Sequence, residues 1–207
     1  VPASWVPQSR PNVVFSMVDT LSGVDTTSIQ LLVDGQLAAS QCATTSTSAD
    51  CWITSTLPEG TRSLTVTVRD LAGNLGSAST SFKIDSQGPL VEYIDPIPGA
   101  ILTTSTPVIQ YLFTDLGSGV DPTAVDFRLD GTVTFSLSCS FGDDGGDCTP
   151  QQPITDGRIS LFASLTDFAG NRTVDAPASF IIDTQAPLLA ITSPAPGSTS
   201  YASPTEI

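Results

Sequence analysis

The chain has 207 residues, with 7 Lys and Arg against 21 Asp and Glu and no His, so its formal net charge is −14 at pH 7. This acidity argues against nucleic acid and anionic membrane surfaces as partners, because both repel a negatively charged protein. No run of residues has the apolar length of a membrane span, so we expect no membrane insertion. With no His and with Lys83 as the single Lys, the chain has few groups for acid–base or nucleophilic chemistry, and we expect it not to be an enzyme.

Taken in chain order, apolar residues alternate with polar ones in four runs. Their apolar positions are Val13, Phe15, Met17; Ile29, Leu31, Val33; Leu64, Val66, Val68; and Phe82, Ile84. The four runs return later in the chain as Ile109, Tyr111, Phe113; Val125, Phe127, Leu129; Leu161, Ala163, Leu165; and Phe180, Ile182. Alternation with a period of two predicts antiparallel strands with one buried face. Its recurrence just under 100 residues later predicts that one folded unit is used twice.

The turns between these runs repeat in the same order. Asp34-Gly35 and Asp130-Gly131 each follow a run directly, as the turn of a β-hairpin does. Asp70–Asn74 and Asp167–Asn171 lie between the last two runs of each unit, where Gly and Asn accommodate the backbone of a turn. The sequence therefore predicts an all-β chain of two tandem antiparallel β-sandwiches, with helical structure limited to short turns.

Each unit carries two cysteines nine positions apart, Cys42 with Cys51 and Cys139 with Cys148. Four Cys without His and without a C-x-x-C spacing predict disulfides and not a zinc site. We pair them within each unit, because a repeated unit is expected to contain its own cross-link. Disulfides form in oxidising compartments, so we expect an extracellular or cell-surface protein.

Several of these motifs together resemble the bacterial immunoglobulin-like repeats found in tandem in extracellular surface proteins and adhesins. The motifs are Asp115–Asp121 with a degenerate copy at Asp19–Asp25, the Leu-Asp-Gly turn, both Asp-x-Ala-Gly-Asn turns, and the linkers Asp85–Pro89 and Asp183–Pro187. The resemblance covers essentially the whole chain and implies that both sandwiches are Ig-like. It also implies a structural role in a surface fibre, filament or adhesin stalk that serves cell adhesion.

The boundaries of the two units are unusual. The second unit opens with the strand Leu90–Ile94, which has no counterpart ahead of the first unit, while the end of the chain repeats this strand. We therefore predict an Ig-like sandwich without its opening strand, a complete Ig-like sandwich, and an additional opening strand, in residues 1–84, 85–182 and 183–207 respectively.

Two interpretations of the additional strand stay open. In the first, the chain is a piece of a longer array, and the strand opens the next unit. In the second, the strand completes the open first sandwich of a neighbouring molecule by donor-strand complementation, because an unpaired sheet edge readily accepts a strand. The donor residues are then Leu188, Leu189, Ala190, Ile191 and Thr192. Under both interpretations the expected partner is the protein itself, as another copy or an adjacent repeat, joined head to tail.

Calcium is the one cofactor that the sequence brings into consideration, because it takes hard oxygen ligands in irregular loops. The candidate ligands are Asp19, Asp25, Asp70, Asp85, Asp115, Asp121, Asp167 and Asp183. In the repeats that this chain resembles, calcium often lies where a linker Asp meets the loops of neighbouring units. The alternative, which we favour, is that these carboxylates accept hydrogen bonds from turn N–H groups.

Two further hypotheses concern glycans. Asn171-Arg-Thr173 is a sequon on a turn, which makes Asn171 a candidate for glycosylation. The alternative to a structural role is a carbohydrate-binding or other ligand-binding accessory module of a secreted protein. For the structural role, we expect any glycan or cell-surface ligand to be bound elsewhere in the full protein.

Overall fold

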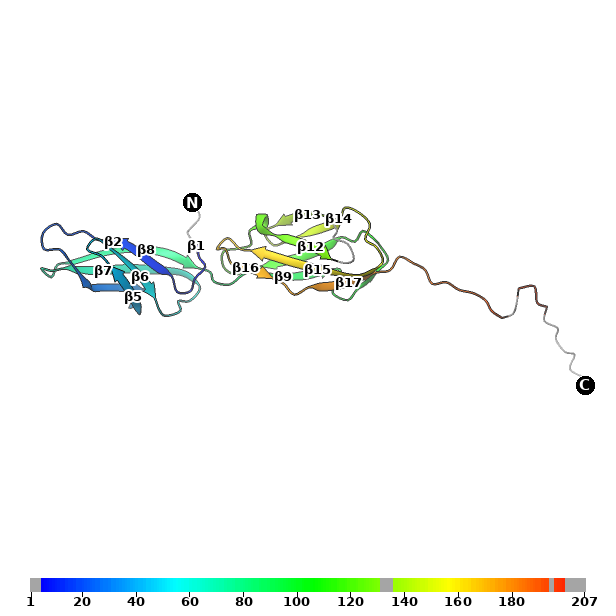
Figure 1. Cartoon of the computed structure of the whole chain (residues 1–207), viewed down its shortest axis with the longest axis horizontal. Helices are drawn as coiled ribbons and strands as arrows, with labels where there is room; N and C mark the ends of the chain where they lie inside the picture. Colours follow the sequence, from blue (N-terminus) through cyan, green and yellow to red (C-terminus); the bar gives the residue numbers. More distant parts are fainter. Residues whose placement is uncertain (1–4, 131–135, 194–195, 200–207) are drawn as a thin grey trace, which may run out of the picture.

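The computed structural model describes residues 5–130, 136–193 and 196–199. The prediction of an all-β fold with two sandwiches is confirmed, and the two units follow one another along the long axis of the molecule (Figure 1). The short 3-10 helix Pro122–Ala124 is the one helical element in the described ranges. None of the helical structure described is long and apolar enough to cross a membrane.

The first unit packs a five-stranded sheet against a three-stranded sheet. The five-stranded sheet has the order β1-β8-β7-β3-β4, and the other has the order β2-β6-β5. The strands are β1 (Trp5–Val6), β2 (Asn12–Ser16), β3 (Val24–Val33), β4 (Gln36–Leu37), β5 (Ser40–Thr44), β6 (Ser48–Ile53), β7 (Gly60–Asp70) and β8 (Leu75–Ile84). Alternate residues of these strands fill the core between the sheets, with Leu31, Cys51 and Ile84 among the most buried.

The second unit repeats this arrangement with one strand more in its smaller sheet. One sheet has the order β10-β17-β15-β12 with β16 beside β15, and the other has the order β13-β14-β11-β9. The strands are β9 (Leu90–Asp95), β10 (Ile101–Leu102), β11 (Ile109–Thr114), β12 (Asp126–Asp130), β13 (Leu137–Gly142), β14 (Gly145–Pro150), β15 (Gly157–Thr166), β16 (Arg172–Val174) and β17 (Ala178–Ile182). Its core contains an aromatic group in which the Tyr111 and Phe127 rings stack with their centroids 3.8 Å apart.

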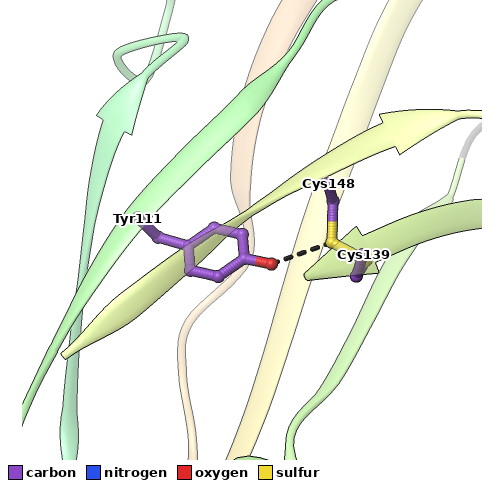
Figure 2. Close-up of a disulfide and its surroundings, with 3 residues drawn as sticks. All are labelled: Tyr111, Cys139 and Cys148. Atoms are coloured by element: carbon purple, nitrogen blue, oxygen red, sulfur yellow. Dashed lines mark hydrogen bonds between the residues drawn. A yellow bond between two sulfur atoms is a disulfide. The ribbon is translucent and has the colours of Figure 1, made fainter. Parts of the chain in front are cut away.

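The two disulfides join Cys42 to Cys51 and Cys139 to Cys148, each across one hairpin of the smaller sheet. In the second unit the hydroxyl of Tyr111 lies 2.8 Å from the sulfur of Cys148 (Figure 2). Burial raises the pKa of Tyr111, and the negative charge of the nearby Asp147 carboxylate raises it further. The hydroxyl therefore keeps its proton and can donate a hydrogen bond to the sulfur. Each disulfide therefore fixes a hairpin directly beside the core.

The two units differ at the start. In the first unit β1 pairs in parallel with β8, and in the second β10 pairs in parallel with β17, so these short strands are equivalent. The second unit has β9 ahead of β10, and β9 pairs in antiparallel fashion with β11. No described strand lies along the corresponding side of β2 in the first unit, where β2 pairs with β6 alone.

The end of the chain extends away from the second unit (Figure 1). Residues Leu188–Thr192, predicted as an opening strand, have no regular secondary structure here. A strand needs a neighbour to satisfy its backbone groups, and no neighbouring strand of the described ranges lies beside this segment. Its apolar side chains Leu188, Leu189 and Ile191 are consequently exposed.

Candidate functional site

The unpaired side of β2 opens onto a groove between the two sheets of the first unit, with a volume of about 520 Å³. One wall is β2 together with Met17, which follows it, and the opposite wall is β8, from Gly76 to Thr80. The floor consists of the core side chains Leu64, Val66 and Val68. The groove is therefore an apolar slot beside a strand whose backbone is free to pair.

In the second unit β9 occupies the equivalent position. Tyr93 lies opposite Tyr111 and Val91 lies opposite Phe113 in the β9–β11 pairing. Val91 and Tyr93 pack against the core, while Glu92 between them is exposed. The second unit thus shows what fills such a groove: a strand with alternate apolar side chains.

The end of the chain has the sequence pattern of β9. Leu189 stands at the position of Val91 and Ile191 at that of Tyr93, 98 positions later. Leu189 is 88% exposed and Ile191 is 78% exposed. The register of β9 on β11, transferred to the first unit, places Leu189 opposite Met17 and Ile191 opposite Phe15.

The segment Asp183–Pro187, which leads into Leu188–Thr192, has the hydrogen bonds of Asp85–Pro89, the linker between the two units. Thr184 donates from its N–H and its hydroxyl to Asp156 at 3.1 and 2.8 Å. Ser86 donates to Glu59 in the same way, from its N–H at 3.1 Å and from its hydroxyl. Gln185 N–H donates to the Asp183 carboxylate, as Gln87 N–H does to that of Asp85. The chain therefore leaves the second unit with the hydrogen bonds with which it leaves the first.

The eight aspartates predicted as calcium ligands or turn caps all accept a hydrogen bond from a backbone N–H. The donors are the N–H groups of Leu21 and Gly23 for Asp19, Thr27 for Asp25, Asn74 for Asp70, Gln87 and Ser118 for Asp85, Gly117 and Gly119 for Asp115, Thr123 for Asp121, Asn171 for Asp167, and Gln185 for Asp183. These contacts are those of carboxylates that cap turns and strand ends.

The structure brings three of the eight aspartates together where the linker meets the second unit. Carboxylate oxygens of Asp85, Asp115 and Asp167 lie within 4.8 Å of one another, and Asp85 and Asp167 are buried. Burial raises the pKa of Asp115, although the N–H groups of Gly119 and Gly117 oppose the shift, and the neighbouring charges of Asp85 and Asp167 add to it. Three carboxylates are a donor set that suits calcium. The other five aspartates do not join a group of three within the described ranges.

The side chain of Asn171 is part of this junction. Its amide nitrogen donates to the Asp85 carbonyl at 2.7 Å, to the Asp167 carboxylate at 2.7 Å and to the Gln87 carbonyl at 3.3 Å. A glycan attached to this nitrogen would disrupt these contacts. The geometry therefore favours a linker-holding role for Asn171 over the predicted glycosylation.

The first unit does not reproduce the linker site. A Cβ atom at Gly117 would overlap the Asp85 carboxylate, and the residue equivalent to Gly117 in the first unit is Leu21. Asp183 therefore cannot dock on a first unit as Asp85 docks on the second. The two linkers therefore share their hydrogen bonds to the preceding unit and the strand sequence that follows, but not the docking of the linker Asp on the next unit.

Reasoning from the sequence missed the β8 wall of the groove. In β8, Ala78 pairs with Val66. The equivalent stretch of the second unit holds one residue more, and there Asp175 N–H donates to the Ala163 carbonyl at 3.0 Å. The sequence does contain a signal of this difference, because the stretch from Asn171 to Phe180 is one residue longer than the stretch from Asn74 to Phe82.

No protein-family model matches this sequence, and no curated protein matches it. Among solved structures, fibronectin(III)-like modules of Clostridium thermocellum CbhA are 15% identical, with 87% of this chain and 90% of that one covered and a TM-score of 0.38. The D00-D0 domain of intimin is 13% identical, with 86% and 95% covered and a TM-score of 0.40. The titin Ig tandem A164-A165 is 11% identical, with 86% and 90% covered and a TM-score of 0.30. These similarities are too low to assign a function.

Proposed function

We propose that this protein is an extracellular structural protein whose Ig-like units join head to tail into a surface fibre or stalk. The joint is a strand addition, in which Leu188–Thr192 of one copy enters the groove beside β2 of the next. The role is mechanical and not catalytic, and the partner is a second copy of the chain.

The observation that carries this proposal is the pairing of an open groove with a matching exposed strand. Burying Leu189 and Ile191 removes apolar surface from water, and the strand satisfies the free backbone groups of β2. The filled groove of the second unit supports the register. In a longer chain, residues ahead of Val1 could supply this strand instead. The pairing of that strand with β2 would then join successive units of one chain.

Size-exclusion chromatography with light scattering, which measures the mass of the protein in solution, tests the proposal. We expect the mass to exceed the 21.4 kDa of one chain and to rise with protein concentration. Leu189→Asp should return the protein to the mass of one chain, because a carboxylate buried without a partner opposes docking in an apolar slot. An unaltered chain that stays monomeric at all concentrations would contradict the proposal.

Ala190→Glu is the matched control. Glu92 stands at the equivalent position of β9 and is exposed there, so a Glu at position 190 should face solvent after docking. This variant adds a similar charge one residue away and should assemble as the unaltered chain does. Equal loss of assembly in both variants would show that charge alone, and not the register, is responsible.

A further inference from the structure

We infer that the disulfide of the second unit is a site of exchange with low-molecular-weight thiols. The thiol attacks the sulfur of Cys139, and the sulfur of Cys148 leaves with a hydrogen bond from Tyr111. This inference goes beyond the proposed strand addition and does not depend on it. It rests on three features of the structure: which sulfur is accessible, what surrounds the other sulfur, and how the two units differ there.

The two cysteines of each disulfide differ in accessibility. Cys139 is exposed and lies on β13, the outermost described strand of its sheet, whereas Cys148 is 1% exposed. The first unit has the same asymmetry, with Cys42 exposed on the outermost strand β5 and Cys51 fully buried. A thiolate must reach the sulfur that it attacks. In both units the edge-strand cysteine is therefore the point of attack, and the buried cysteine is the leaving group.

The leaving group of the second unit has a hydrogen-bond donor beside it. The Tyr111 hydroxyl lies 2.8 Å from the Cys148 sulfur (Figure 2). A disulfide sulfur carries no proton, so the hydroxyl is the donor in this contact. Negative charge develops on the Cys148 sulfur as the S–S bond breaks, and a hydrogen bond to a charged acceptor is roughly twice as strong as one to a neutral acceptor. Tyr111 therefore stabilises the departing thiolate more than the intact disulfide, which speeds its departure.

The first unit has no hydroxyl at this place. Phe15 corresponds to Tyr111, because each lies opposite the residue two positions before the buried cysteine of its unit. An aspartate precedes the buried cysteine in both units, as Asp50 and Asp147, so a carboxylate neighbours both leaving groups. The Tyr111 hydroxyl is thus a difference between the two leaving groups that a single substitution can remove from one unit or add to the other.

The exchange needs no co-reactant besides the thiol. The thiol loses its proton to solvent, because the thiolate is the nucleophile, and its sulfur forms a bond with the Cys139 sulfur. The bond between Cys139 and Cys148 breaks, and its electron pair leaves with the Cys148 sulfur, which then takes up a proton. The product is a mixed disulfide at Cys139 with a thiol at Cys148.

Trapping the mixed disulfide tests which sulfur is attacked. The full chain is treated with β-mercaptoethanol, an uncharged thiol, and free thiols are alkylated with N-ethylmaleimide at early times. Peptide mass spectrometry then locates both groups. Among chains that carry mercaptoethanol in the second unit, we expect it on Cys139 and the maleimide on Cys148. The reverse labelling, or reaction of this disulfide in urea only, would contradict the inference.

Moving the hydroxyl between the units tests its role. Tyr111→Phe should slow reduction of the second disulfide about fivefold, the factor that corresponds to one hydrogen bond, and leave the first disulfide unchanged. Phe15→Tyr should speed reduction of the first disulfide by a similar factor. Phe15 is half-buried and lines the open groove, which leaves room for the added hydroxyl. Both disulfides are followed in the same sample, so each is the control for the other.

The direction of the effect separates this role from a purely structural one. If Tyr111 only held the hairpin in place, Tyr111→Phe would loosen the hairpin and make reduction faster. Faster or unchanged reduction of the second disulfide in this variant would therefore overturn the inference. Phe15→Tyr repeats the test in a unit where no native contact of the hydroxyl is lost, and melting curves check that both variants are folded at the assay temperature.

Discussion

At the scale of single residues, the aspartates of this chain serve two different environments. Asp25, Asp34, Asp70 and Asp156 lie on the surface, and hydrogen bonds to the ionised carboxylate lower the pKa of each. Asp115 is the opposite case, since burial raises its pKa and the carboxylates of Asp85 and Asp167 add to the shift. Its ionised form is therefore disfavoured in the folded state.

This contrast predicts the effect of Asp115→Asn on the second unit. The amide oxygen can still accept from Gly117 and Gly119, but the like charge is removed. In EDTA at pH 7 we expect the melting temperature to rise by roughly 1–2 °C. The folded-state pKa of Asp115 lies above the unfolded value. As the pH falls through the raised pKa, Asp115 of the unaltered protein becomes protonated and no longer destabilises the folded state. The difference in melting temperature between the two proteins should therefore vanish at low pH.

Asp121→Asn is the control for this prediction, since Asp121 caps a turn of the same unit outside the group of three. It should not raise the melting temperature. A lower melting temperature for Asp115→Asn in EDTA would contradict the account. Adding calcium should stabilise the unaltered protein and not Asp115→Asn, if the three carboxylates hold the ion.

At the scale of elements, each hairpin of the smaller sheets is held by one disulfide that spans nine positions. Replacing both Cys139 and Cys148 by Ser should lower the free energy of unfolding by about 2–3 kcal/mol, because the short loop is no longer closed in the unfolded chain. Urea unfolding of the second unit measures the loss. The equal spacing predicts a similar loss for Cys42→Ser with Cys51→Ser in the first unit, and a loss under 1 kcal/mol in both would contradict the entropic explanation.

The strands and hairpins could be predicted from the sequence because they depend on local patterns. The alternation of Val13, Phe15 and Met17 identifies β2 as the counterpart of β11, and β9, the neighbour of β11, has no counterpart among the described strands of the first unit. The resemblance predicts that a linker Asp meets the loops of a neighbouring unit, but the pattern does not tell which of the eight aspartates join Asp85, because the other members come from two distant loops that only the folded junction brings together. The β8 wall of the groove was hidden for a similar reason, since its position depends on the register between β7 and β8.

At the scale of the whole molecule, the sequence of an opening strand lies a full repeat away from the open groove that it matches. The first unit has the groove without the strand, and the end of the chain has the strand without a groove. The linker hydrogen bonds repeat at both ends of the second unit, so the chain leaves the second unit with the local geometry with which it leaves the first. In the proposed assembly, Leu21 in place of Gly117 would make the joint between copies differ from the joint within a copy.

A disulfide trap between two copies tests this account most directly. In the register of β9, Ser16 lies opposite Ala190, as Leu112 lies opposite Glu92. An isotopically labelled chain with Ser16→Cys is mixed with an unlabelled chain carrying Ala190→Cys, and Asn12→Cys replaces Ser16→Cys as the out-of-register control. Peptide mass spectrometry should find the two introduced sulfurs joined between a labelled and an unlabelled copy for Ser16→Cys and not for Asn12→Cys. Absence of that linkage, or equal linkage in the control, would contradict the account.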